Sequence, residues 1–195
     1  MRVLVGCEIS GTVRDTFLAK GHDAYSCDLK PNEHKKHLQL DVFFAIKSAR
    51  QFGDGSPWDL IILHPSCTAL AVSGNRWYGK GMPRHDERIA AIRWTNSLWN
   101  TAKRYAPRVC LENPVSVLGG SPMGKPTQYI QPWQFGHGET KKTGLWLSGL
   151  PQLKPTDIVT GRDQRIWKMG PSPERAALRS ITYQGIADAM AAQWG

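Results

Sequence analysis

The sequence has few cysteines, and it lacks the paired cysteines and long apolar runs that mark several classes of protein. None of its cysteines forms a C-x-x-C pair, and their spacing does not match a zinc or iron–sulfur site, so we expect reduced thiols and no bound metal. No apolar stretch approaches the ~20 residues that a membrane helix needs, and the first residues do not form a signal peptide. The protein is therefore predicted to be cytoplasmic, without a membrane partner. The four cysteines are Cys7, Cys27, Cys67 and Cys110.

Acidic residues are also scarce. The 195 residues include 16 Asp and Glu against 25 Lys and Arg, which gives a formal charge of +9. Such an excess favours a polyanionic partner, nucleic acid first, although a solvated basic surface without a partner explains it equally well. The length and the 41% hydrophobic content suit one domain with a sizeable core.

Apolar runs alternate with amphipathic segments along the first two thirds of the chain. The strands are short and some are apolar throughout, as expected when helices cover both faces of a sheet. This alternation predicts an α/β fold with a doubly wound, mostly parallel, Rossmann-like sheet. The predicted strands are 2–8, 23–29, 37–42, 59–64 and 108–114, and the predicted helices are 11–20, 45–53, 86–107 and a short one near the end.

The pattern changes after Pro114. Residues 125–138 and 141–153 are typical of two antiparallel strands, so we expect a hairpin at the edge of the sheet. The basic, irregular stretch 154–180 indicates a loop or small cap. We find no repeat or linker, and we predict a single catalytic domain over 1–195.

Polar residues and glycines follow the predicted strands, where doubly wound sheets bind ligands. Gly6 and Gly11 permit close approach of the backbone, and Ser10 is a suitable N-cap for the first helix. Asp28 ends the second strand, where an acid can accept hydrogen bonds from ribose hydroxyls. The pattern is not G-x-G-x-x-G, so it favours a nucleoside-containing cofactor over a dinucleotide, with an ordinary turn beside an exposed acid as the alternative.

A cysteine and a glutamate follow the fourth and fifth strands. Cys67 comes just after a buried strand and the turn Pro65-Ser66, and Glu112 stands near the end of the next strand. If these strands are neighbours, the two side chains face one pocket, where a thiolate nucleophile and a carboxyl group make a suitable pair. Alternatively, Cys67 is a small packing residue and Glu112 a surface carboxylate.

Several motifs in this order resemble those of the DNA cytosine-C5 methyltransferases, and most closely the short phage or prophage members. The resemblance runs over most of the chain, and it implies a methyltransferase sheet and S-adenosylmethionine as the cofactor. The segments that carry it are VLVGCEISGTVRDTFLAKGHDAYSCDL (3–29), DLIILHPSC (59–67), LENP (111–114), YIQPWQFG (129–136), KKTGLWLSGLPQLKPT (141–156) and TYQGIADAMAAQWG (182–195). The cofactor-binding residues that we expect are Gly6, Glu8, Ser10, Gly11, Asp28, Asp41 and Pro65.

The resemblance also implies roles for the cysteine and the glutamate. Cys67 would add to C6 of a cytosine extruded from duplex DNA, which makes C5 nucleophilic toward the methyl group, and Glu112 would hydrogen-bond N3 and the exocyclic amine. Asn113 and Pro65 would hold the loops in shape. The substrate-binding residues that we expect are Asn113, Gln131, Arg76 and Lys141.

The sequence departs from the family pattern in three ways. Ser66 stands where a second proline usually precedes the cysteine, the usual Gln-x-Arg-x-Arg strand is absent, and there is no room for a target-recognition domain. Specificity is therefore short or relaxed, or it comes from a homodimer or an accessory subunit. The alternatives are a same-fold enzyme that modifies a pyrimidine in RNA or in a nucleotide or uses an altered cofactor, and an inactive nucleic-acid-binding relative.

A glycine-rich stretch, residues 73–85, follows the predicted nucleophile. It carries basic residues together with Trp77 and Tyr78, the aromatic side chains best placed to stack on a base. We predict a mobile lid over an extruded base, with an ordinary flexible loop as the alternative. The other tryptophans are expected in the core.

Overall fold

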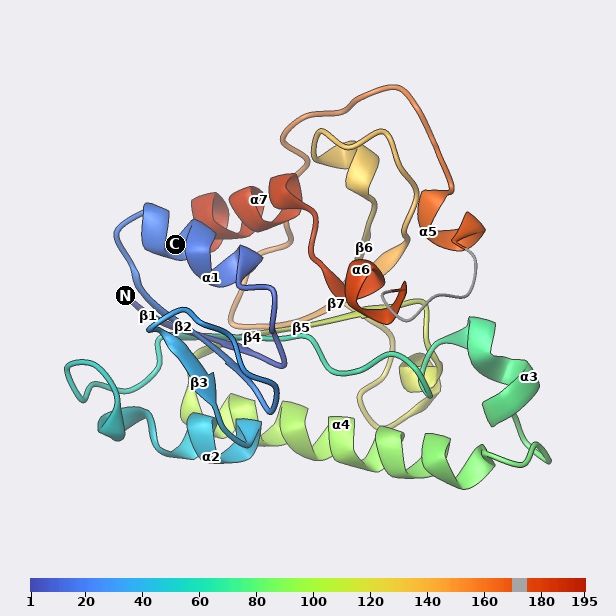
Figure 1. Ribbon diagram of the computed structural model, residues 1–195, viewed down its shortest axis with the longest axis horizontal. Coiled ribbons are helices and arrows are strands. Elements are labelled where there is room, and N and C mark those ends of the chain that lie inside the picture. The colour runs from blue at the N-terminus through green and yellow to red at the C-terminus, as the bar shows by residue number, and fades with distance from the viewer. Residues whose placement is uncertain (170–174) are drawn as a thin grey trace.

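A seven-stranded sheet forms the centre of the structure, a computed structural model that describes residues 1–169 and 175–195 (Figure 1). The strand order is β3-β2-β1-β4-β5-β7-β6. Neighbouring strands from β3 to β5 are parallel, and β7 is antiparallel to both β5 and β6. The predicted fold, a doubly wound α/β sheet with an antiparallel edge hairpin, is confirmed. The strands are β1 (Arg2–Gly6), β2 (Asp23–Asp28), β3 (His37–Gln39), β4 (Leu60–Leu63), β5 (Arg108–Pro114), β6 (Gln128–Ile130) and β7 (Thr143–Ser148).

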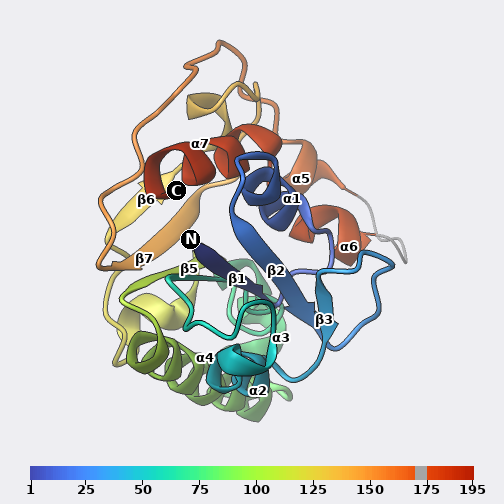
Figure 2. The same ribbon diagram turned by 90° about the vertical axis from the view of Figure 1, so that its left-hand side faces the viewer.

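Helices cover both faces of the sheet. The helices α1 (Thr12–Ala19) and α7 (Gln184–Trp194) lie on one face, and α2 (Val42–Lys47) and α4 (His85–Tyr105) lie on the other (Figures 1 and 2). The remaining helices are α3 (Asn75–Tyr78), α5 (Arg165–Lys168) and α6 (Arg175–Ser180), and short 3-10 turns are at Ala49–Gln51, Val72–Gly74, Val117–Gly120 and Pro132–Gln134.

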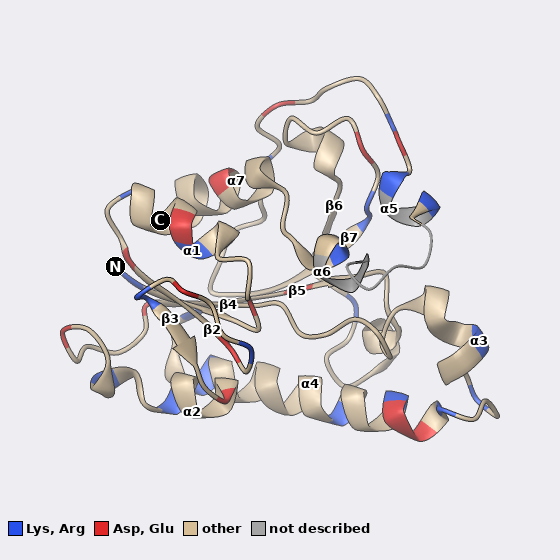
Figure 3. Ribbon diagram, in the orientation of Figure 1, with Lys and Arg blue, Asp and Glu red and all other residues tan. Residues whose placement is uncertain are grey.

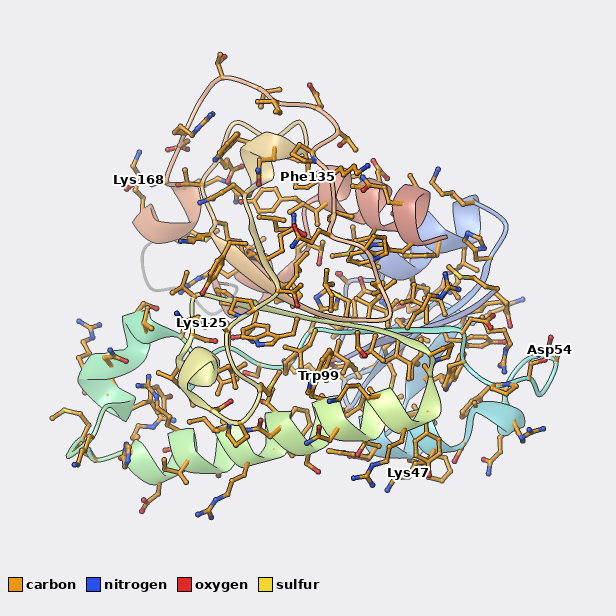
Figure 4. All side chains as sticks on the ribbon, turned by 180° about the vertical axis from the view of Figure 1, so that it is seen from behind. Lys47, Asp54, Trp99, Lys125, Phe135 and Lys168 are labelled. Atoms are coloured by element: carbon orange, nitrogen blue, oxygen red, sulfur yellow. The ribbon has the colours of Figure 1, made fainter. Side chains whose placement is uncertain are left out.

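Strand residues alternate between two hydrophobic cores. Leu4 packs on the side of α2 and α4, whereas its neighbours Val3 and Val5 pack on the side of α1 and α7. Figure 4 shows Trp99 and Phe135 on opposite sides of the sheet, in keeping with their places in the two cores. Burial on both faces explains why these strands are apolar throughout rather than alternating with polar residues.

Two predicted helix starts are wrong, for a shared physical reason. The N-cap of α1 is Gly11, not Ser10, and the Glu8 carboxylate accepts hydrogen bonds from the first-turn N–H groups of Val13 (2.7 Å) and Arg14 (3.4 Å). Helix α2 begins three residues before the predicted start, because Asp41 caps its first turn. In both places, a carboxylate satisfies backbone N–H groups that would otherwise lack partners.

The glycine-rich stretch 73–85 contains a short helix, and its role as a mobile lid stays a prediction. Its middle forms α3, where Tyr78 is buried and Trp77 is 53% exposed. Tyr78 is therefore unsuited to stacking on a base, and Trp77 alone keeps that possibility. Trp94, which we expected in the core, is 40% exposed and meets Phe43 edge to face.

The basic stretch 154–180 carries α5 and α6, separated by residues 170–174, which lie outside the described residues. The count of one catalytic domain stays a prediction. Within the described ranges, 1–169 and 175–195, we find no helix with the length and apolarity that crossing a membrane requires.

Candidate active site

The candidate site lies at the carboxyl ends of β1, β4 and β5. From β1 the chain winds outward to β2 and β3, and from β4 it winds the other way to β5. Neighbouring loops diverge at such a switch point, and the space between them is the usual ligand site of this architecture. The loop after β1 contains Cys7 to Gly11, and the loop after β4 contains Cys67.

A buried hydrogen bond joins the two motifs that were expected to act together. Asn113 donates from Nδ2 to the carbonyl oxygen of Pro65 at 3.0 Å, and its side chain is almost fully buried. The carbonyl of Cys67 in turn accepts hydrogen bonds from the N–H groups of Leu70 and Ala71. The cysteine loop is thus fastened to the end of β5. Asn113 and Pro65 thus support this loop from within, and a contact of either residue with a ligand stays a prediction.

Arg88, on α4, holds the far side of the same loop. Its buried guanidinium donates from Nε to Ala69 O at 2.7 Å, from Nη2 to Ala71 O at 3.1 Å and from Nη1 to Asn75 Oδ1 at 2.7 Å. Sequence reasoning missed this arginine, because a charged residue in an amphipathic helix is normally exposed. Arg88 lies four residues before the apolar Ile92 and so on the same face of the helix. This spacing was the available signal that Arg88 points inward.

Glu112 is held as a carboxylate beside His64. The imidazole Nδ1 lies 3.1 Å from Glu112 Oε2, with 8% and 17% of the two side chains exposed. Burial pushes the pKa of Glu112 upward, but the hydrogen bond from His64 and the charge of Lys141 outweigh it, and the pKa lies below its usual value. Sequence reasoning did not assign His64.

A small pocket of about 10 Å³, which has room for about one water molecule, lies beside Glu112. The described residues that line it do not include Cys67, so the expectation of one pocket shared by both side chains is not met by this cavity. Its polar lining residues are Glu112, Lys141, Thr143, Thr182 and Tyr183.

The charges of Glu112 and Lys141 nevertheless affect the pKa of Cys67. Burial, followed by the charge of Glu112, raises the pKa of the thiol above its usual value of 9.0, while Lys141 and Arg179 oppose the shift. The Nζ of Lys141 donates to the carbonyl of Arg179 at 2.9 Å, which ties the start of β7 to α6. At neutral pH the thiol is thus protonated, although a cysteine nucleophile reacts as the thiolate.

The loop after β1 has a constrained backbone. Cys7 has a φ of 60°, and among the described residues it is the only one other than glycine with a positive φ. Gly11 has a φ of 77°, and a Cβ at this position would collide with the buried guanidinium of Arg14. Glycine is therefore required at position 11 for the turn and for the packing against Arg14.

Two carboxylates converge on this loop from the neighbouring strands. Burial and then the charge of Asp28, with a smaller contribution from Asp41, raise the pKa of Cys7 to about 12. Asp28 Oδ1 accepts a hydrogen bond from Lys30 N at 2.9 Å, and none of the described residues donates to Oδ2. Beside it, Leu29 is 73% exposed. An acid with an open oxygen next to an exposed apolar side chain fits a ligand with ribose hydroxyls and a flat base.

Of the other expected cofactor residues, Glu8 and Gly6 have structural parts, and a contact of these residues or of Ser10 with a cofactor stays a prediction. Glu8 is buried, and its carboxylate caps α1. Gly6 lies inside β1, where a Cβ would collide with Leu63 and Val42. Ser10 is exposed beside Glu8, with its Oγ 3.4 Å from Glu8 Oε1.

Gln131 and Arg76, which we expected to bind the substrate, contact other residues of the chain. Gln131 accepts a hydrogen bond at Oε1 from Lys141 N (3.0 Å), so it supports the turn that presents Lys141. Arg76 lies on α3, with its guanidinium 5.4 Å from the ring centroid of Trp77. A direct contact of either residue with a base stays a prediction. Within the described residues, no group of His, Cys, Asp and Glu side chains could hold a metal ion.

The chain was compared with protein families, curated proteins and solved structures, and it resembles solved structures only in part of its fold. No family profile matches the sequence. No curated protein matches it. The chain is similar to a solved structure from E. coli, a candidate DNA modification methyltransferase encoded within a prophage, with a TM-score of 0.49 and 15% sequence identity. The match covers 82% of this chain and 53% of that chain, so this chain spans about half the length of the solved one.

Proposed function

We propose that the protein is an S-adenosylmethionine-dependent methyltransferase that methylates C5 of cytosine in DNA through a covalent adduct of Cys67. The observation that carries the proposal is the hydrogen bond from Asn113 to Pro65. It fastens the cysteine loop to the end of β5, which brings Cys67 within the influence of Glu112. A thiol nucleophile and a base-holding carboxylate are the two groups that this chemistry requires.

The chain supplies the nucleophile and the groups that hold the base. The Cys67 thiolate would add to C6 of the cytosine, which would make C5 nucleophilic. The Glu112 carboxylate would accept a hydrogen bond from the exocyclic amine and so orient the ring toward the thiolate. Loss of the C5 proton and then of the thiolate restores the aromatic ring. S-adenosylmethionine, when bound, supplies the methyl group.

Because the pKa of Cys67 is raised in the free protein, a bound base can help to activate the thiol. Burial and then the charge of Glu112 disfavour the thiolate in the free protein. A base that donates its amine hydrogen to Glu112 disperses that charge, while Lys141 continues to favour the thiolate. The nucleophile therefore becomes reactive when a base is present, which limits side reactions of the thiol.

S-adenosylmethionine fits the residues at the ends of β1 and β2. Asp28 would accept hydrogen bonds from its ribose hydroxyls, and Leu29 would provide an apolar surface for its adenine. The constrained turn from Cys7 to Gly11 would approach the rest of the cofactor with backbone atoms.

DNA would approach the same edge of the molecule. Basic residues occur on α3, α5 and α6, beyond the carboxyl ends of the strands (Figure 3). Phosphate contacts of this kind position a duplex without reading its sequence. Sequence specificity would then come from few contacts, from a homodimer or from an accessory subunit.

Tritiated methyl transfer to DNA, RNA and free nucleotides, measured in parallel, tests the proposal. We expect transfer to DNA, and Cys67→Ala should abolish it while cofactor binding, followed by calorimetry, persists. Cys110→Ala is the matched control, because this thiol is buried in the core beside α1 and α7. DNA that carries 5-fluorocytosine should become covalently trapped on the wild-type protein, since fluorine cannot leave as a proton does.

Transfer only to RNA or nucleotides would replace the DNA assignment with a same-fold pyrimidine-modifying enzyme. DNA binding without transfer or trapping would indicate an inactive relative or a different cofactor. Normal methylation by Cys67→Ala would overturn the mechanism.

A further inference from the structure

His64 occupies the centre of the candidate site. It follows β4, and β4 lies between β1 and β5 in the sheet. Its backbone N–H donates to Gly6 O at 2.9 Å, which extends the pairing of the two strands by one residue. The side chain therefore stands between the loop after β1 and the end of β5, where Glu8 and Glu112 lie.

One side of the imidazole is fixed, and the other has no partner. The side chain is 8% exposed, and Nδ1 lies 3.1 Å from Glu112 Oε2. Because Glu112 is a carboxylate, the proton of this hydrogen bond is assigned to Nδ1. Nε2 is buried and has no hydrogen-bond partner among the described residues. A buried polar atom without a partner is costly unless a water molecule or a ligand supplies one.

The charged groups around His64 come from three directions. Glu112 faces it from β5, and Lys141, before β7, acts on Glu112. From the loop after β1, Glu8 lies close to His64. Burial raises the pKa of Glu8, and the charge of His64 opposes this rise. The imidazole thus lies between the loop after β1, which we assign to the cofactor, and the end of β5, which we assign to the base.

We propose that His64 is a positioning residue, which fixes the Glu112 carboxylate for the target base and gains a ligand partner at Nε2. The terminal torsion of a glutamate is broad, so a free carboxylate samples many orientations. A hydrogen bond to Oε2 fixes its plane and leaves Oε1 for the edge of the base. This assignment rests on the proposed function, because the role of Glu112 does.

Substitutions of His64 separate the two parts of the assignment, which are the positioning of Glu112 through Nδ1 and the ligand partner at Nε2. His64→Asn keeps a donor close to the place of Nδ1 but loses Nε2, whereas His64→Ala loses both. In single-turnover methyl transfer, we expect His64→Ala to be slower by about 10- to 100-fold, as for other residues that orient a functional side chain. His64→Asn should recover part of that rate. His22→Asn, just before β2 and so at the end of the parallel strands opposite the site, is the control and should match wild type.

A double substitution distinguishes positioning from general support of the fold. If His64 acts through Glu112, His64→Ala should add no further loss of rate to Glu112→Gln. Losses that multiply would overturn the positioning role, and so would a wild-type rate in His64→Ala.

Nitrogen NMR of labelled histidine provides a readout independent of turnover. The Nδ1–H signal of His64 should be protected from exchange in wild type and exposed in Glu112→Gln. The Nε2 resonance should shift when S-adenosylhomocysteine binds or when 5-fluorocytosine DNA is trapped, and the two arms show which ligand supplies the partner. An Nε2 that shifts in neither arm overturns the second half of the assignment.

Failure of the proposed function would look different. If wild type neither methylates nor is trapped by any nucleic acid, the role assigned to Glu112 is wrong, and so is the role assigned to His64. If wild type is active and only the His64 substitutions have no effect, the His64 assignment alone is wrong.

Discussion

The two halves of the candidate site use their carboxylates in opposite ways. On the side of β1 to β3, Glu8 and Asp41 accept hydrogen bonds from the first turns of α1 and α2, so they build the loops. On the side of β4 and β5, Glu112 accepts from a side chain, and its charge acts on Cys67. The first half is fixed by backbone hydrogen bonds. The second half is governed by electrostatic interactions among side chains, which a bound base or a change in pH can alter.

Glu112→Gln should produce the largest contrast between the halves. Methyl transfer should fall by about 10²- to 10³-fold, as when one preorganised transition-state contact is lost. Cofactor affinity, which depends on the other half, should not change. Glu87→Gln, on an exposed pair with Arg84 at the start of α4, is the matched control.

The same variant should make Cys67 more reactive toward iodoacetamide. Burial and then the charge of Glu112 raise the pKa of the thiol above 9.0, so removal of that charge lowers the pKa and increases the thiolate fraction at pH 8. In wild type, the alkylation rate should climb about tenfold from pH 7 to 8, because the thiolate is a minor species below a pKa of 9.0 or more. Mass spectrometry of Cys67, with Cys67→Ala as background, measures both effects. Slower alkylation in Glu112→Gln would contradict the electrostatic coupling.

Asp28→Asn should produce a smaller effect, confined to the cofactor half. The loss of a hydrogen bond to a charged acceptor is worth about 1.5–3 kcal/mol, so the affinity for S-adenosylhomocysteine should fall by roughly 10- to 100-fold. Calorimetry measures the affinity, and alkylation of Cys67 should stay at the wild-type rate. Asp54→Asn is the control, on the exposed loop before β4 (Figure 4). An unchanged affinity in Asp28→Asn would place the cofactor elsewhere.

Lys141→Gln should show the smallest effect, of the opposite sign to that of Glu112→Gln. Lys141 lowers the pKa of Cys67, so its loss raises that pKa and slows alkylation by about two- to fivefold at pH 8. Lys142→Gln, whose Nζ lies over the ring of Tyr129, is the neighbouring control. Equal rates for both variants would show that the positive charge near the thiol comes from another residue.

Local patterns predicted the strands well and the helix starts less well. The apolar runs of β1, β4 and β5 are read directly, because both faces of these strands are buried. The starts of α1 and α2 were misplaced, because their capping carboxylates come from positions that were assigned to ligand binding. Tyr78 and Trp77 illustrate the same limit, since neighbouring aromatic residues with similar sequence context differ in burial.

The sequence by itself determined the α/β fold and the antiparallel edge, since these depend on periodicity, and it made Cys67 and Glu112 the candidates for the site, since both stand near the ends of strands. Only the tertiary structure decided what those residues touch. The bond from Asn113 to Pro65, the clamp of Arg88 on the cysteine loop and the pairing of His64 with Glu112 join residues from separate elements. The distances and charges that set the state of the thiol arise when the sheet brings those elements together, and no local pattern encodes them.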